Sequence, residues 1–425
     1  MSTPRLSGFF LRVLGALLLL LIAIELALRF LWAGPATDHR VVWSMSSAEN
    51  LAIQDLSGPL LLVSKYLMPG LIAPPKTRIL LVDAQSGGTV RQIFPAGWVR
   101  FAQDHKDTAP ECSLRLVDQR RRILGVQGPW LVLMDALDGS EVRRVLPDKD
   151  LLEPSPGTYR ARSFAFAVSP ADGSTAIAYN IGASPRLYVY THDLAGLLYA
   201  SQLERYIEDV AWSPDGRQLA LLYSGSFDEH RNFVGFGPSF KELTLPDVEV
   251  LDGHSGAKLA AFFSGGRERQ IAFSRDGNLL YTITAPSLSD TAPGKLCDGV
   301  MRVISWKSGQ LIRVLEHPAT GLRTSFALSG DGKWVAADAS TALPHLFFTE
   351  PDPFGDRSRF VVLDALTGKV QFEIYRRTST AREPNLVFSG DSRLLFAVLG
   401  PGRSGQERAR QESSLTAYCV APPCK

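Results

Sequence analysis

Short apolar runs, separated by turn residues, recur along most of the chain. Four segments share one order: an apolar run, a Ser-x-Asp turn and a second apolar run, beginning at Val210, Ile271, Phe326 and Leu386. Their turn aspartates are Asp215, Asp276, Asp331 and Asp391. The spacings of 61, 55 and 60 residues between these aspartates indicate an internal repeat. Because Asp bonds its own backbone in tight turns, and Gly supplies a positive φ, each segment predicts a β-hairpin.

A second hairpin signature follows the first six copies of the repeat. It ends in a Gly turn and begins at Leu81, Leu133, Val189, Val250, Val303 and Val362. Weaker copies of the first signature begin at Leu51, Leu114 and Phe166, which brings the number of repeats to seven. Two hairpins per repeat make a four-stranded antiparallel unit, and a ring of such units leaves only short edges. The sequence therefore predicts an all-β, seven-bladed β-propeller over residues 41–425, with six or eight blades as less favoured counts.

The alternating turns resemble those of known repeat families. Ser-Pro-Asp-Gly at 213–216 and Asp-Ala-Leu-Thr-Gly at 364–368 are similar to the turns of WD-repeat and YVTN-type propellers, and to the TolB-like repeats of bacterial envelope proteins. The chain departs from true WD repeats because it has no Trp-Asp dipeptide. The resemblance covers about nine-tenths of the chain and implies a fold rather than a function.

The first forty residues have a different pattern. Residues 9–32 are almost entirely apolar, and a helix of that length, rising about 1.5 Å per residue, crosses a hydrocarbon layer of about 30 Å. Arg12 and Arg29 bracket the most apolar stretch and reach toward the two interfaces. We expect a tail over 1–8, a transmembrane helix over 9–32 and a linker over 33–40. A cleaved signal peptide is the alternative, although Pro35 is badly placed for cleavage.

This arrangement predicts a single-pass protein of a bacterial inner membrane with the propeller outside the cytoplasm. The basic residues flanking the apolar run are nearly balanced, so they leave the orientation open. The seventh repeat lacks an outer strand, and residues 41–45 are the natural donor of one, which would close the ring. This closing strand would begin on the face that carries the short turns. Because only residues 33–40 separate it from the membrane, we expect the short-turn face to look toward the bilayer.

Composition narrows the range of ligands. The 45 basic and 43 acidic residues are too balanced for broad nucleic-acid binding. Cys419 and Cys424 are close enough in sequence to form a disulfide, whereas Cys112 and Cys297 are far apart. The chain has no CxxC motif, and its seven histidines do not cluster with these thiols. We therefore expect neither a metal site nor a cofactor.

Binding residues are expected on the long connections, which leave the face opposite the short turns. Two of these connections are rich in aromatic and charged residues: Phe227, His230, Arg231, Phe233 and Phe236 in one, and Phe347 and Phe348 in another. They resemble a surface for a protein or peptide partner. The competing interpretation is that these aromatic rings only pack their own loops together.

Arginines recur where the chain enters successive innermost strands. They are Arg162, Arg205, Arg269, Arg323 and Arg382. A ring of guanidinium groups at a channel mouth would attract an anionic ligand, unless neighbouring glutamates cancel its field. The sequence favours a non-enzymatic, membrane-anchored scaffold for protein interactions. The alternative is a hydrolase or lactonase-like enzyme with its site at the channel mouth, although no catalytic motif marks one.

Overall fold

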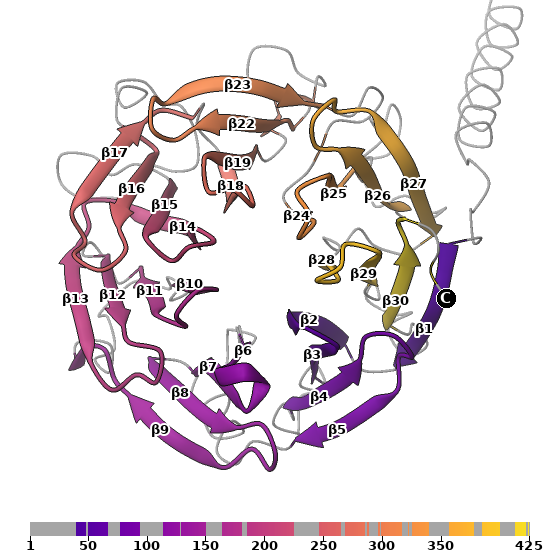
Figure 1. The fold of residues 1–425 in the computed structure, drawn as a ribbon, viewed down its shortest axis with the longest axis horizontal. Coiled ribbons are helices and arrows are strands. Elements are labelled where there is room, and N and C mark those ends of the chain that lie inside the picture. The colour runs from indigo at the N-terminus through magenta and orange to yellow at the C-terminus, as the bar shows by residue number, and fades with distance from the viewer. Residues whose placement is uncertain are drawn as a thin grey trace, which may run out of the picture.

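The computed structural model is a ring of seven four-stranded antiparallel sheets (Figure 1). It describes residues 40–47, 50–66, 77–93, 114–127, 129–149, 164–180, 185–224, 246–264, 268–284, 287–288, 296–297, 299–316, 322, 325–339, 357–377, 385–399, 413–421 and 424. Each sheet is one blade, and in six of the seven the first strand along the chain is innermost and the last is at the perimeter (Figure 1). The seven-bladed, all-β prediction is confirmed.

The first six blades take their strands in chain order. Blade 1 contains β2 (Asn50–Ser57), β3 (Leu60–Tyr66), β4 (Thr77–Asp83) and β5 (Thr89–Ile93). Blade 2 contains β6 (Leu114–Val117), β7 (Arg122–Gln127), β8 (Trp130–Asp135) and β9 (Glu141–Val145). Blade 3 contains β10 (Phe164–Val168), β11 (Thr175–Tyr179), β12 (Arg186–Tyr190) and β13 (Leu197–Gln202).

Blades 4 to 6 repeat this order. Blade 4 contains β14 (Tyr206–Trp212), β15 (Gln218–Ser224), β16 (Val248–Asp252) and β17 (Lys258–Phe262). Blade 5 contains β18 (Glu268–Phe273), β19 (Leu279–Thr284), β22 (Met301–Ser305) and β23 (Gln310–Leu315). Blade 6 contains β24 (Phe326–Leu328), β25 (Trp334–Asp338), β26 (Arg357–Asp364) and β27 (Val370–Arg377).

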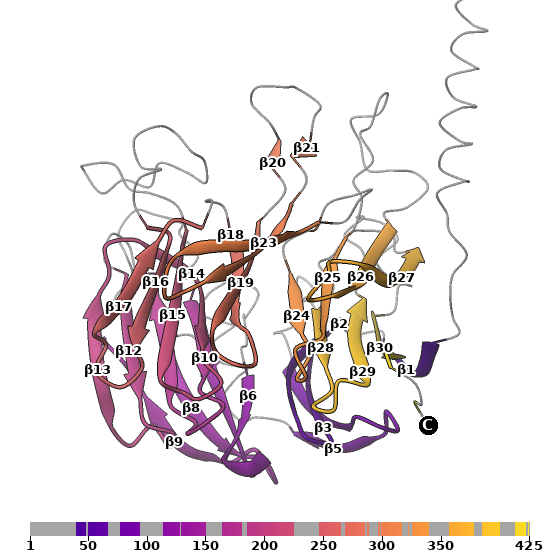
Figure 2. The ribbon, with the colours of Figure 1, turned by 45° about the horizontal axis from the view of Figure 1, so that its top comes forward.

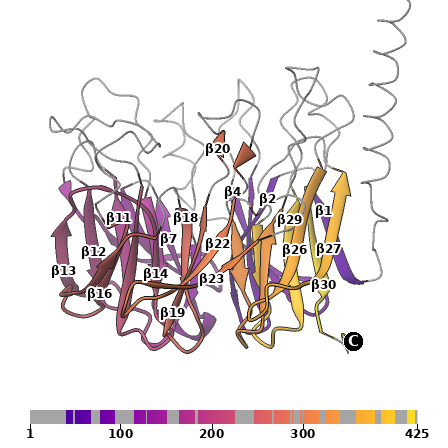
Figure 3. The ribbon, with the colours of Figure 1, turned by 90° about the horizontal axis from the view of Figure 1, so that it is seen from above.

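Blade 7 is assembled from both ends of the propeller. It contains β28 (Asn385–Phe388), β29 (Leu394–Leu399) and β30 (Ser413–Cys419), and its outer strand is β1 (Val41–Ser47). Val41 lies opposite Tyr418, whose partner on β29 is Leu395, just after the short turn of this blade. The closing strand predicted over 41–45 is therefore confirmed, and so is its start on the short-turn face (Figure 3).

The hydrophobic core lies between neighbouring blades rather than within any one of them. Where blade 7 meets blade 1, Phe396 and Leu415 form one buried cluster with Leu61 and Val82. Trp43 of β1 packs against the same cluster, and its indole Nε1 donates a hydrogen bond to the Ala84 carbonyl at 3.0 Å. The closing strand thus joins a core that continues into blade 1.

The repeated Ser-x-Asp residues stabilise the inner turns. In blade 4, the Ser213 hydroxyl donates to the Asp215 carboxylate at 2.7 Å and accepts the Gln218 N–H at 2.9 Å. The same pair of contacts recurs at Ser274, Ser329 and Ser389. The Ser213 hydroxyl holds the pKa of Asp215 below its ordinary value. These aspartates are therefore turn caps, not acids available for catalysis.

Two inner turns achieve the required backbone without glycine. Ser392 has a φ of 61° where Gly216 has 71° in blade 4. In blade 2 the turn is a short 3-10 segment, η2 (Asp118–Arg120), whose three residues all have positive φ. Non-glycine residues are uncommon in this region because their Cβ atoms crowd the backbone. The divergent sequence of blade 2 thus keeps the hairpin but at a conformational cost.

One predicted long connection contains structure of its own. Residues 285–297 include a small hairpin of β20 (Ser287–Leu288) and β21 (Leu296–Cys297), which projects beyond the ring on the side away from the short turns (Figure 2). The predicted tail, the transmembrane helix and the linker up to residue 39 lie outside the described residues. Within the described ranges, no helix is long and apolar enough to cross a membrane.

Candidate functional site

The innermost strands surround the central axis of the ring (Figure 1). Polar side chains near this axis tie neighbouring blades together. Asp209 of blade 4 accepts the Val210 N–H and, with its second oxygen, the Ile271 N–H of blade 5, each at 2.9 Å. In blade 1, Asp55 likewise accepts the Leu116 N–H of blade 2 at 2.7 Å. Each carboxylate bridges two strands that do not share a sheet.

Amide side chains make the same kind of bridge elsewhere. Gln270 of blade 5 accepts the Phe326 N–H at 2.8 Å and donates to the Phe326 carbonyl at 3.1 Å. Asn180 of blade 3 accepts the Ile207 N–H at 2.9 Å and donates to the Ile207 carbonyl at 2.8 Å. These contacts satisfy innermost backbone groups that face the next blade, where no ladder partner exists. The polar groups of the wall therefore hold the ring together.

A basic residue balances the wall carboxylates. Arg115 of blade 2 donates through Nη1 to the carbonyl oxygens of Gln54 and Leu114 at 2.6 and 2.9 Å. Burial raises the pKa of Asp55, and the nearby Arg115 opposes that rise. Burial also raises the pKa of Asp209 to about 7, against the opposing effects of its N–H donors and of Arg115. Asp209 is thus an acid that titrates near neutral pH in a structural position.

The structure describes two arginines of the predicted ring, and both are engaged with partners. Arg269 Nη1 lies 2.7 Å from Glu208 Oε1, in an ion pair between blades 5 and 4. The Arg205 guanidinium lies 4.5 Å from the ring centroid of Tyr223, a cation–π geometry. Glu208 thus contacts the guanidinium group of Arg269 and Tyr223 that of Arg205, although both groups were expected to face an anion. Arg162, Arg323 and Arg382 lie outside the described residues, so the anion site stays a prediction.

The aromatic residues predicted to bind a partner also lie outside the described residues. They are Phe227, His230, Arg231, Phe233, Phe236, Phe347 and Phe348. The strands that carry their connections are described, because β15 ends at Ser224 and β16 begins at Val248. The antiparallel order places this connection on the face opposite the short turns. That placement agrees with the sequence prediction, whereas the partner itself stays untested.

Two acids lie together at the base of this connection. Glu268 is 2% exposed, and its Oε1 accepts a hydrogen bond from Arg302 Nη1 at 2.9 Å. Asp247 accepts the N–H and the hydroxyl of Ser264 at 2.6 and 2.9 Å. Burial and the neighbouring Asp247 raise the pKa of Glu268 to about 7, and Arg302 opposes the rise. Burial and a neighbouring carboxylate both favour the neutral form of Glu268.

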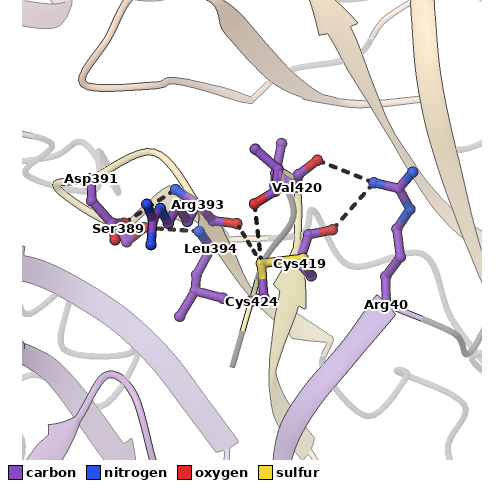
Figure 4. Close-up of a disulfide and its surroundings, with 9 residues drawn as sticks. Arg40, Ser389, Asp391, Arg393, Leu394, Cys419, Val420 and Cys424 are labelled. Carbon is purple, nitrogen blue, oxygen red and sulfur yellow. Dashed lines mark hydrogen bonds between the residues drawn. A yellow bond between two sulfur atoms is a disulfide. The ribbon is translucent and has the colours of Figure 1, made fainter.

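The predicted disulfide between Cys419 and Cys424 is present, with the two Cα atoms 5.7 Å apart. It lies where β30 ends, beside the start of β1 (Figure 4). Arg40 donates to the carbonyl oxygens of Cys419 and Val420 at 3.3 and 3.2 Å, so the first described residue is held at the same corner. In the described part of the chain, no three His, Cys, Asp or Glu side chains gather in a group that could hold a metal ion.

Sequence reasoning missed the wall contacts, although a signal was present. Asp209 and Gln270 each stand immediately before the first apolar residue of the repeat, where the chain turns its side chain toward the next blade. Glu208 and Asp209 are adjacent in the sequence, and neither residue type by itself indicates a structural role there. Their actual partners come from blade 5, 61 and 62 residues along the chain, and hence depend on the ring geometry.

Comparison with known proteins identifies the fold alone. No protein-family model matches the chain, and no curated protein sequence matches it either. Among solved structures, the chain is similar to Kuenenia stuttgartiensis hydrazine synthase, with 13% identity and a TM-score of 0.53, over 89% of this chain and 97% of that one. It is also similar to a chain of a mitotic checkpoint complex, with 12% identity and a TM-score of 0.52, over 91% of this chain and 94% of that one.

Proposed function

We propose that this chain is a membrane-tethered, non-enzymatic scaffold of the bacterial envelope that binds a protein or peptide on its long-connection face. The observation that carries the proposal is the asymmetry of the two faces. One face has short turns whose polar groups are bound within each turn, and it receives the N-terminal connection at Arg40. The opposite face takes all the long connections, including residues 225–245 between β15 and β16. A rigid ring that presents variable loops on its free side suits recognition.

The extracytoplasmic location is supported by the disulfide between Cys419 and Cys424, since such bonds persist in oxidising compartments. The apolar run over 9–32 supports the membrane tether. A hydrolase at the channel mouth would need an available acid or nucleophile there. The acids described on the innermost strands, Asp55, Glu208, Asp209 and Glu268, are instead bound to arginines or to backbone N–H groups.

Photo-crosslinking in native membranes tests the scaffold. A crosslinking amino acid is placed within residues 225–245, and the trapped proteins are identified by mass spectrometry. Two further variants carry the crosslinker within residues 340–356 of blade 6, one with residues 225–245 intact and one, the linker variant, with them replaced by a short Gly-Ser linker. Asp247 is kept, because it holds Ser264 in place. We expect one partner to be trapped from both connections and lost in the linker variant.

The control keeps both connections and changes Asn278, an exposed residue in a short turn of blade 5, to Ala. This variant should trap the same partner as the parent protein. A linker variant that folds normally and traps the same partner from residues 340–356 would show that the 225–245 connection is not part of the binding face.

A further inference from the structure

Every blade carries a β-bulge at the same register of its outer strand. In blade 1, Leu81 pairs with Arg91 and Val82 pairs with Thr89, which leaves Val90 between them without a partner on β4. The unpaired residues in the seven outer strands are Val42, Val90, Val142, Leu198, Leu259, Ile312 and Gln371. A bulge on an edge strand bends the strand and redirects a side chain. Here it redirects an aliphatic side chain in every blade except blade 6.

These aliphatic side chains are exposed to solvent. Their exposed fractions range from 37% at Val42 to 57% at Val90. Val41, Leu197 and Leu311 directly precede three of the bulge residues, and Leu137 and Leu366 stand in the turns before β9 and β27; all five are exposed too. We call these eleven residues the aliphatic rim. Of the large apolar residues exposed in the described ranges, only Phe263 and Val314 lie outside it.

The rim residues are exposed because their neighbours in the strand face the next blade instead. Arg91 Nη1 donates to the Leu137 carbonyl of blade 2 at 3.0 Å, and Arg313 Nη1 donates to the Ala365 carbonyl of blade 6 at 2.9 Å. The indole of Trp43 makes the equivalent contact with Ala84. The bulge residues Val90, Ile312 and Val42 directly precede Arg91, Arg313 and Trp43, and no neighbouring blade covers them. Outer edges of sheets usually carry charged residues at such positions, so aliphatic side chains here are unusual.

The rim lies at one end of the ring. In blades 1 to 6 the bulge follows the turn between the third and fourth strands by one to three residues, and these turns share the face of the inner short turns. In blade 7 the bulge at Val42 lies near the start of β1, on the same face. The strands that carry the rim bulges, β1, β5, β9, β13, β17 and β23, stand at the perimeter of the ring (Figure 1), so the rim encircles its short-turn end. A globular partner would cover a patch on a few blades. The rim includes the bulges of six blades and the outer turn of blade 6. An apolar belt of this kind fits a planar surface.

The connection of the chain also leads to this end. Arg40 is bound at the corner of blade 7 and lies 4.2 Å from the ring centroid of Phe372 in blade 6. Residues 33–40 span at most about 26 Å, so a membrane anchor over 9–32 would bring the bilayer within that distance of Arg40. Exposed basic residues stand in four inner turns of the same face, at Arg217, Arg275, Lys333 and Arg393, each within two residues of a turn aspartate. Lipid phosphate groups are suitable partners for such residues.

We propose that the aliphatic rim inserts into the interfacial layer of the lipid bilayer, so that the propeller rests on the membrane with its short-turn face down. This inference rests on the membrane tether proposed above. It adds that the tethered domain has one fixed orientation, with the long-connection face pointing away from the lipid. The bilayer holds the rim directly, and no second protein is required.

The two ends of β17 provide a matched test. Leu259 belongs to the rim, and Phe263 is exposed to a similar extent, at 44% against 48%, just past the opposite end of the strand. Single cysteines replace each residue in a full-length protein carrying Cys112→Ser and Cys297→Ser. Each variant is reconstituted into liposomes that contain no other protein and is labelled at its cysteine with an environment-sensitive fluorophore. Quenching of the fluorescence by lipids brominated near the headgroup is then measured. We expect at least threefold stronger quenching at Leu259→Cys than at Phe263→Cys.

The outcomes separate this inference from the tether. If the protein floats with the liposomes after alkaline washing but the two labels are quenched equally or not at all, the rim proposal is wrong and the tether stands. If the protein does not float, the tether and the rim proposal both fail. Stronger quenching at Phe263→Cys also overturns the rim proposal.

A second measurement tests whether negative charges in the rim weaken its insertion into the bilayer. Val90→Glu, Leu198→Glu and Ile312→Glu are combined in a protein labelled at Leu259→Cys, and urea unfolding checks that the propeller is intact. We expect quenching of this label to fall at least twofold, because each carboxylate opposes insertion. Val314→Glu, which charges an exposed residue outside the rim, serves as the control and should leave quenching unchanged. Undiminished quenching in the folded triple variant would contradict a role for the rim.

Discussion

Trp43 lies on the closing strand β1 and contacts blade 1, so replacing it measures how much the closure of the ring stabilises the propeller. Its half-buried indole covers the turn at Gly87, where a Cβ atom would lie 2.6 Å from the ring carbons, and stands 5.8 Å from the ring of Phe396. Removing about 100 Å² of buried apolar surface costs about 2.5 kcal/mol. Losing the hydrogen bond from Nε1 to the Ala84 carbonyl adds about 1 kcal/mol. Trp43→Ala should therefore destabilise the propeller by about 3.5 kcal/mol.

Urea unfolding of the full chain in mild detergent, followed by circular dichroism, measures this loss as a shift of the midpoint. Trp43→Phe is the matched control, because it keeps an aromatic ring in the seam and removes mainly the hydrogen bond, at a cost of about 1 kcal/mol. A midpoint for Trp43→Ala within error of the parent protein would refute closure through β1. In that case blade 7 would be held without its fourth strand.

The other predictions concern a turn, a titrating acid and the disulfide. Gly87→Ala should cost more than 1 kcal/mol, because Gly87 has a φ of 71° and no room for a Cβ, whereas Gly88→Ala should be nearly neutral in the same urea assay. Since burial raises the pKa of Asp209 to about 7, the folded state retains a proton that the unfolded state releases. This group's contribution to stability is therefore present at about pH 4 and is lost as the pH rises to about 7. Asp209→Asn should reduce the change of the urea midpoint with pH between pH 5 and 8. An unchanged dependence on pH would refute the assignment. Reducing the disulfide, which closes a very short loop, should cost about 2 kcal/mol, and Cys424→Ser should abolish the response to reductant.

The repeat alone predicted the blades, because a hairpin is specified locally. A Ser hydroxyl, an Asp carboxylate and a residue with positive φ lie within a few positions of one another, and their contacts form inside one turn. The short-turn face follows from the same local order. In a four-stranded antiparallel blade the first and third turns lie on the same face, and both are short. The pairing of Cys419 with Cys424 is also local, and the sequence indicated it correctly.

Contacts between blades required the tertiary structure. The carboxylate of Asp209 reaches an N–H 62 residues away, and Arg269 reaches an acid 61 residues away, at separations that no local pattern specifies. The ring also brings Arg115 close enough to influence Asp209 across two blades. Sequence could suggest charge at the channel, but only closure of the ring decided that these charges are paired with one another.

The sequence by itself determined the number of blades, the side that carries the short turns and the identity of the closing strand. The tertiary structure decided which side chains meet between blades, and it revealed that one bulge recurs in all seven outer strands. Hairpins depend on interactions over a few residues, whereas the exposure of Val90 or Leu259 depends on how far apart outer strands stand once the ring has closed. That spacing is a property of the whole circle, and it leaves an apolar belt on one end of the molecule.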